Sequence, residues 1–221
     1  MNGSTREDGP YSSNDLNSST GLKKFLYSGI LGSVITSISY LAALAYYLLA
    51  LPIGYFDVNG YMFHFSFVYG LFIPFSTPLL SAGYYGLSRK YHQEILTIAA
   101  GIMTLAFVLS IYGTAVLIAW FNVPAFASMH FPALYIIVVN SILIGVGFHK
   151  VHAQSFNPRV VRIYALLLIG WNTIFLFMQF YNFITLYNLG LILFIVIHHS
   201  LNIILGILSV YIFRGESRTL S

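Results

Sequence analysis

The chain has 221 residues, of which 58% are hydrophobic and only 7% charged, whereas soluble domains average about a quarter charged residues. Because so few charged side chains cannot cover a soluble domain of this size, the composition predicts an integral membrane protein. The absence of cysteine excludes disulfides, thiolate metal sites and thiol nucleophiles. The net charge of +4 comes from basic residues without interleaved aromatic residues, which argues against a nucleic-acid partner.

The two ends of the chain are polar. Residues 1–22 are rich in Ser, Asn and Gly and carry too little apolar surface to order themselves, so we expect a disordered cytoplasmic tail. Residues 23–215 are predicted to form one transmembrane domain, and residues 216–221 a short cytoplasmic tail.

Between these ends the chain contains six apolar runs, each about as long as the 20 residues that cross a bilayer. The connections between the runs are short, which favours antiparallel packing of neighbouring helices in one bundle. The predicted fold class is therefore all-α, a polytopic membrane protein of six transmembrane helices. The runs are 25–51, 60–87, 95–120, 131–149, 161–186 and 189–213.

Basic residues predict the orientation of these helices. When the N-terminus is placed inside, all ten Lys and Arg residues fall on the cytoplasmic side, as the positive-inside rule requires. We therefore expect a multi-pass protein of the cell membrane with both termini in the cytoplasm. The ten residues are Arg6, Lys23, Lys24, Arg89, Lys90, Lys150, Arg159, Arg162, Arg214 and Arg218.

Two features of the first two runs predict local structure. Gly29, Ser33 and Ser37 form a row of small residues at i+4 spacing, which permits close helix packing, either within the chain or between two copies. Pro74 and Pro78 each lack an amide hydrogen and clash with the preceding turn, so we expect a kink in the second helix.

The seven histidines fall into two groups. His92, His149 and His152 lie near the cytoplasmic ends of the runs, where they are expected to be wet interfacial side chains. The other four lie in the outer portions of the second, fourth and sixth runs, which all point the same way: His64, His130, His198 and His199. An imidazole at this depth is costly, so these rings are expected to face the bundle interior and to bind something there.

Four interpretations of the deep histidines remain open. The rings hydrogen-bond neighbouring helices, or His64 and one of His198 and His199 hold a haem b between facing helices. The third possibility is a bare copper or zinc site that includes His130, and the fourth is a proton relay. Side chains at adjacent positions on a helix point about 100° apart, so His198 and His199 cannot both bind the same group. The candidate supporting or quinone-edge groups are Asn202, Tyr61, Trp171 and Asn172.

The second run, "FHFSFVYGLFIPFSTPLLSAGYYGL" at residues 63–87, resembles the haem-bearing second helix of the haem–copper oxidase catalytic subunit. The shared pattern is His64 near the outer end, Pro74 ten residues later and Gly83 near the inner end. The stretches "MHFPALYIIVVNSILIGVGFHKVH" and "NPRVVRIYALLLIGW" are similar to helix pairs of shorter cytochrome oxidase subunit I-like relatives. The resemblance implies His64 as one haem ligand and His198 or His199 as the other.

The resemblance stops short of the oxygen-reducing machinery. The sequence contains neither His-Pro-Glu-x-Tyr nor His-x-His, so this chain is not expected to reduce oxygen alone. We expect a haem b-binding electron-transfer or respiratory accessory subunit of an oxidoreductase complex, in contact with lipid, other membrane subunits and quinol. The alternative is a non-enzymatic membrane subunit or small-molecule carrier component with structural histidines, because topology does not imply function.

Overall fold

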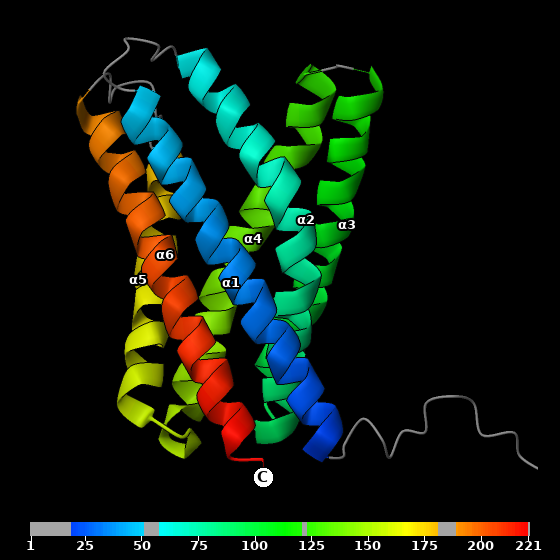
Figure 1. Cartoon of the computed structure of the whole chain (residues 1–221), viewed down its shortest axis with the longest axis vertical. Helices are drawn as coiled ribbons and strands as arrows, with labels where there is room; N and C mark the ends of the chain where they lie inside the picture. The colour runs from blue at the N-terminus through cyan, green and yellow to red at the C-terminus, as the bar shows by residue number, and fades with distance from the viewer. Residues whose placement is uncertain (1–18, 51–57, 121–122, 181–188, 221) are drawn as a thin grey trace, which may run out of the picture.

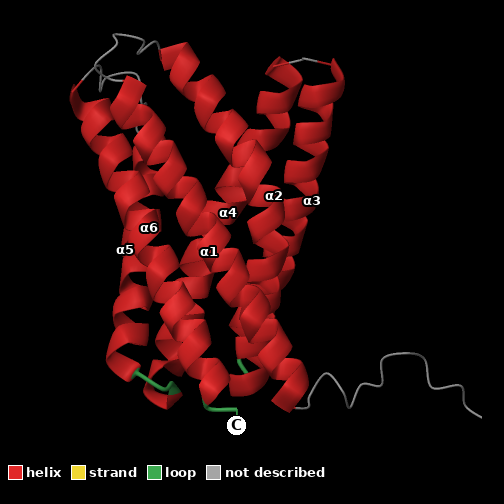
Figure 2. Ribbon diagram, in the orientation of Figure 1, coloured by secondary structure: helices red, strands yellow, loops and turns green. Residues whose placement is uncertain are grey.

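The structure, a computed structural model, describes residues 19–50, 58–120, 123–180 and 189–220, with side chains for residues 19–49, 75–109, 135–177 and 196–220. In this part of the chain there are six α-helices, one 3₁₀ turn and no strand (Figures 1 and 2), which confirms the all-α prediction. The elements are α1 (Ser19–Ala50), α2 (Val58–Tyr91), α3 (Glu94–Trp120), α4 (Val123–Val151), η3 (His152–Gln154), α5 (Pro158–Phe180) and α6 (Leu189–Arg218).

Four stretches among the described side chains are long and apolar enough to cross a membrane: Ser19–Leu49, Tyr135–Gln154, Pro158–Phe177 and Val196–Arg218. A shorter apolar stretch covers Glu94–Leu109 of α3. Large hydrophobic side chains on these helices are exposed, among them Leu49 and Phe177, as contact with a lipid bilayer requires. The chain is therefore a membrane protein, and the count of six spans stays a prediction.

The helices pack in chain order, each against the next, and α1 also packs along α6. Figure 1 shows α3 and α4 diverging from α1, α5 and α6 toward the end of the bundle that lies away from the C-terminus. Helix α1 contacts both α2 and α6, so it stands between the helix that carries His64 and the helix that carries His198 and His199.

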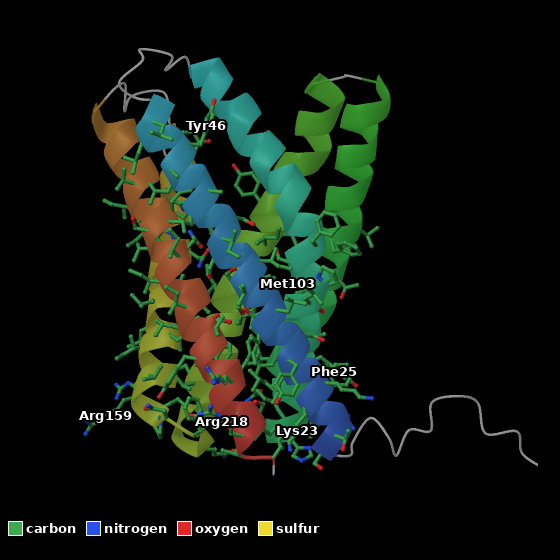
Figure 3. The ribbon with its side chains drawn as sticks, viewed as in Figure 1. Lys23, Phe25, Tyr46, Met103, Arg159 and Arg218 are labelled. Carbon is green, nitrogen blue, oxygen red and sulfur yellow. The ribbon has the colours of Figure 1, made fainter. Side chains whose placement is uncertain are left out.

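One end of the bundle holds the described basic residues, and we call it the basic end. Lys23, Arg159 and Arg218 mark it in Figure 3. The start of α1 and the C-terminus both lie at this end (Figure 1). The arrangement agrees with the sorting of Lys and Arg to one side that the sequence predicts.

Helix α1 has one buried and one exposed face. Ser33 and Tyr47 are 1% and 3% exposed, and they share a face with the buried Leu26. Leu31 and Ile38 lie on the opposite face and are more than half exposed. Since residues three, four and seven apart share one side of a helix, α1 presents one stripe to the bundle and one to lipid.

The row of small residues on α1 packs inside the chain. A Cβ added to Gly29 would lie 2.8 Å from Cα of Gly83 on α2 and 2.9 Å from the ring of Phe213 on α6. The hydroxyl of Ser33 lies 2.8 Å from the hydroxyl of Ser209 on α6. These contacts confirm the prediction of close packing within the chain, and they join α1, α2 and α6 where their backbones come closest.

The large described core lies in the half of the bundle next to the basic end. It draws buried side chains from all six helices, including Leu26, Leu87, Leu96, Phe148 and Phe213. The hydroxyls of Tyr84 and Tyr164 meet within this core at 3.4 Å. A second, smaller cluster of Val138, Trp171 and Phe175 lies farther from the basic end.

The helix ends differ from the predicted boundaries. Helix α1 begins at Ser19, within the segment predicted as a tail, and α6 continues to Arg218, beyond the predicted end of the transmembrane domain at residue 215. Residues 1–18 of the predicted tail lie outside the described part of the chain. Helix α2 is continuous through Pro74 and Pro78, and its ribbon changes direction along its length (Figure 1), in agreement with the predicted kink.

Candidate functional site

His198 and His199 lie in the interior of the bundle, on α6. Their exposed fractions are 8% and 0%. Their ring centroids are 5.4 Å apart, and the two planes are inclined at 78°. The rings therefore point in different directions, as their adjacent positions on a helix predict.

Aromatic rings from two neighbouring helices surround the pair. Tyr40 of α1 contacts both imidazoles, with its ring centroid 5.9 Å from that of His198 and 5.8 Å from that of His199. Tyr47, two turns farther along α1, lies 5.4 Å from His199. Trp171 and Phe175 of α5 lie 5.7 and 4.9 Å from His198. We call these residues, together with the two histidines and Asn202, the histidine cluster.

Asn202 sits one turn after His198 on α6. Its Nδ2 lies 3.4 Å from Nε2 of His198 and donates to the main-chain oxygen of His198 at 2.8 Å. Asn202 can donate to the ring as well, provided that Nε2 carries no proton. Asn202 lies four residues after His198 and three after His199, and in the structure its amide is beside the ring of His198.

The other candidate residues divide into those that reach the cluster and those that do not. Trp171 contacts His198, as described above. Nδ2 of Asn172 donates to the main-chain oxygen of Leu168 on its own helix at 2.8 Å. His64, Tyr61 and His130 belong to α2 and α4, but their side chains lie outside the described residues.

The three remaining histidines lie at the basic end. His92 and His149 are exposed, and His152 is half-buried. The rings of His149 and His152 stack with centroids 5.2 Å apart, and Nδ1 of His152 bonds the His149 oxygen. Their positions agree with the prediction of wet interfacial side chains.

A haem at His198 or His199 stays a prediction, because the side chain of the other predicted ligand, His64, lies outside the described residues. An axial ligand needs an open direction at its ring nitrogen, and iron sits about 2 Å from that nitrogen. At His198 the amide of Asn202 faces Nε2, and Trp171 and Phe175 contact the ring, so an axial bond in this packing would have to come from Nδ1. His199 is likewise enclosed by Tyr40 and Tyr47. In the described part of the chain no three His, Asp or Glu side chains gather as a metal site would need.

Among the aromatic partners of the histidines, sequence reasoning named Trp171 but missed Tyr40, Tyr47 and Phe175. Tyr40 and Tyr47 are seven residues apart on α1, and Trp171 and Phe175 are four apart on α5, so each pair shares one helix face. This spacing was a usable signal that two neighbouring helices present aromatic rings to a common point. The spacing did not indicate that α6, which carries the two histidines, is the helix that these aromatic faces contact.

Sequence reasoning also missed a buried acidic residue. Glu216 lies in the segment predicted as a cytoplasmic tail, yet it is 1% exposed and pairs with Lys90. Its position seven residues after the buried Ser209 on α6 places both on one helix face.

Comparisons with known proteins give this chain no relatives: no protein-family model matches it, and neither a curated protein nor a solved structure is significantly similar to it.

Proposed function

We propose that the chain is a six-span integral protein of the cell membrane with both termini in the cytoplasm. Four candidate spans and a fifth apolar stretch in α3 support the count. The gathering of Lys23, Arg159 and Arg218 at the end that holds the C-terminus supports the orientation (Figure 3). The exposed apolar faces of these helices would then contact the lipid bilayer.

Within the membrane, we propose that it serves as a non-enzymatic subunit or as a small-molecule carrier component whose histidines are structural. The observation that carries this proposal is the enclosure of His198 and His199 by four aromatic rings and Asn202. Aromatic pairs at centroid separations of 4.5–7 Å contribute about 0.5–1.5 kcal/mol each beyond their buried area. The two imidazoles therefore help to join α6 to α1 and α5 through their ring contacts.

The second candidate is a haem b-binding electron-transfer subunit, linked to quinol and to respiratory partners. One observation favours it, namely that two imidazoles with aromatic walls lie in the half of the bundle away from the basic end, where the resemblance predicts a haem. Its other predicted ligand is His64. In the observed packing Nε2 of His198 faces Asn202, so ligation through Nε2 would require the ring to turn, whereas ligation through Nδ1 would not.

An absorption spectrum of the detergent-purified protein, oxidised and then reduced with dithionite, separates the two candidates. We expect a colourless protein without a Soret band, and no haem in a pyridine extract. A red protein whose band is lost in His64→Ala and in either His198→Ala or His199→Ala, but kept in the exposed control His149→Ala, would instead establish the second candidate. Metal analysis of the same sample tests for copper or zinc.

A further inference from the structure

The carboxylate of Glu216 joins three elements at the basic end. Its Oε2 accepts hydrogen bonds from Nζ of Lys90 and from the hydroxyl of Tyr91, both in the last turn of α2. Its Oε1 accepts from the main-chain N–H of Phe156, in the connection between α4 and α5, at 3.1 Å. Figure 1 shows the ends of α2 and α6 close together at this end. One side chain of α6 is therefore bonded to α2 and to the α4–α5 connection.

The surroundings of the carboxylate are tightly packed. Nζ of Lys90 also donates to the main-chain oxygen of Glu216 at 3.1 Å and to Oγ1 of Thr219. A Cβ added to the neighbouring Gly215 would lie 2.3 Å from the ring of Phe156, so the connection rests directly on the backbone of α6. Burial, and then the Glu216 carboxylate, raise the pKa of Tyr91, so its hydroxyl remains a donor at neutral pH.

An ion pair is a poor way to add stability at this position. Two charges lose their hydration when they are buried, and apolar side chains of similar size often hold helices equally well or better. The core beside the pair, with Leu87, Phe148 and Phe213, already joins the same helices by apolar contact. The side chain of Lys90 is 14% exposed, whereas that of Glu216 is 1% exposed. Water can therefore reach the ammonium of Lys90, while the carboxylate of Glu216 is buried.

We propose that Glu216 is a latch: its bonds to Lys90, Tyr91 and Phe156 hold the basic end of the bundle closed, and loss of the charge pair lets this end open. The latch goes beyond the proposed function, because it acts in the same way in a carrier component and in an accessory subunit. Opening would separate the end of α6 from the end of α2, while the contacts around the histidines stay in place.

The test is a distance measurement between spin labels, for which a chain without cysteine is well suited. Arg89→Cys on α2 and Arg218→Cys on α6 place one label pair at the basic end. Leu49→Cys on α1 and Phe177→Cys on α5, both exposed, place a control pair toward the opposite end. Pulsed electron paramagnetic resonance then gives the distance distribution of each pair in lipid nanodiscs.

We expect Glu216→Gln and Lys90→Met each to lengthen and broaden the distribution at the basic end, by about 5 Å, the scale of a one-turn helix displacement. The control pair should keep its wild-type distribution in both variants. Lys90→Arg keeps the charge and should leave both pairs unchanged. Glu94→Gln removes an exposed carboxylate at the same end and should also change neither pair.

Two results would overturn the latch. The first is an unchanged distribution at the basic end in both neutralised variants, which would make the ion pair an ordinary structural contact. The second is equal broadening of both label pairs, which would mean that the whole bundle loosens. If Lys90→Met fails to fold because it leaves a buried carboxylate alone, the double variant Lys90→Met/Glu216→Gln removes both charges and carries the same expectation.

Discussion

Helix α6 carries two buried polar groups whose surroundings differ in kind. His198 and His199 lie among aromatic rings, and the amide of Asn202 lies beside His198. Glu216 lies among donors instead: an ammonium, a phenol and a main-chain N–H. At 1.5 Å per residue, about 27 Å of helix separates residues 198 and 216.

The difference follows from the depth of each site. Deep in a bilayer a charge is costly, so the groups found there are ones that can remain neutral, such as an imidazole. At the basic end a lysine stem can bring its ammonium in from the water, so an ionised carboxylate can be buried there and still be paired. The histidine cluster is therefore suited to joining helices through uncharged contacts. The basic end, in contrast, can hold a helix contact that depends on an ion pair.

The largest effect is expected when a carboxylate is placed in the histidine cluster. His199→Glu places a carboxylate beside Tyr40 and Tyr47. Among the described residues of α1, α5 and α6, no Lys or Arg lies near this position. We expect a loss of about 5 kcal/mol or more in the free energy of unfolding, a size reached when a charge is buried without a partner. Unfolding in mixed detergent micelles, followed by circular dichroism, measures the loss. A variant as stable as the wild type would mean that a donor or water reaches His199.

The next largest effect is expected from Lys90→Met. Removing one partner of a buried pair leaves the other charge uncompensated, which costs about 3–5 kcal/mol. The double variant Lys90→Met/Glu216→Gln should recover most of this loss, since it leaves no charge behind. The same detergent unfolding experiment, carried out on both single variants and the double variant, gives the coupling energy. If the two single losses simply add, the two side chains are not coupled and the ion pair has no special role.

The helical architecture could be predicted from the sequence because it depends on short-range signals. Apolar runs of bilayer length and polar connections locate the helices, and the positions of Lys and Arg sort their ends. The row of Gly29 and Ser33 predicts close packing, which is found against Gly83 and Ser209. Each of these signals lies within a single helix or at its ends.

The environment of the histidines could be predicted only in part. Asn202 is four residues after His198 and three after His199, so the sequence predicts that it lies beside one of these rings but does not determine which one. The approach of Tyr40 and Phe175 depends on how α1 and α5 rotate about their axes, which one helix alone does not determine. Glu216 was missed for a related reason. Its charge and its closeness to the C-terminus suggest a wet tail, whereas its partners Lys90 and Phe156 come from distant parts of the chain.

A smaller effect is expected from Gly215→Ala, which tests how closely the α4–α5 connection must approach α6. The added methyl would lie 2.3 Å from the ring of Phe156, so that ring must move, and its N–H would move away from Oε1 of Glu216. We expect a loss of about 1–3 kcal/mol, the usual range for overpacking. Gly101, where an added Cβ meets nothing within 4 Å, provides the matched control Gly101→Ala. Equal stability of the two alanine variants would show that the connection is free to shift.

The smallest effect is expected from His198→Phe, which asks whether the histidine cluster needs an imidazole at all. A phenyl ring keeps the aromatic contacts with Trp171 and Phe175 and loses the 3.4 Å contact with Asn202. Asn202 keeps its 2.8 Å bond to the main-chain oxygen of residue 198. One neutral hydrogen bond contributes about 1 kcal/mol, so the free energy of unfolding should fall by about that amount. His149→Phe, at an exposed position, should change it by less than about 0.5 kcal/mol. A loss of several kcal/mol in His198→Phe, or the loss of a visible absorption band, would show that the ring nitrogen holds something that a phenyl ring cannot, and the histidine cluster would then be a binding site.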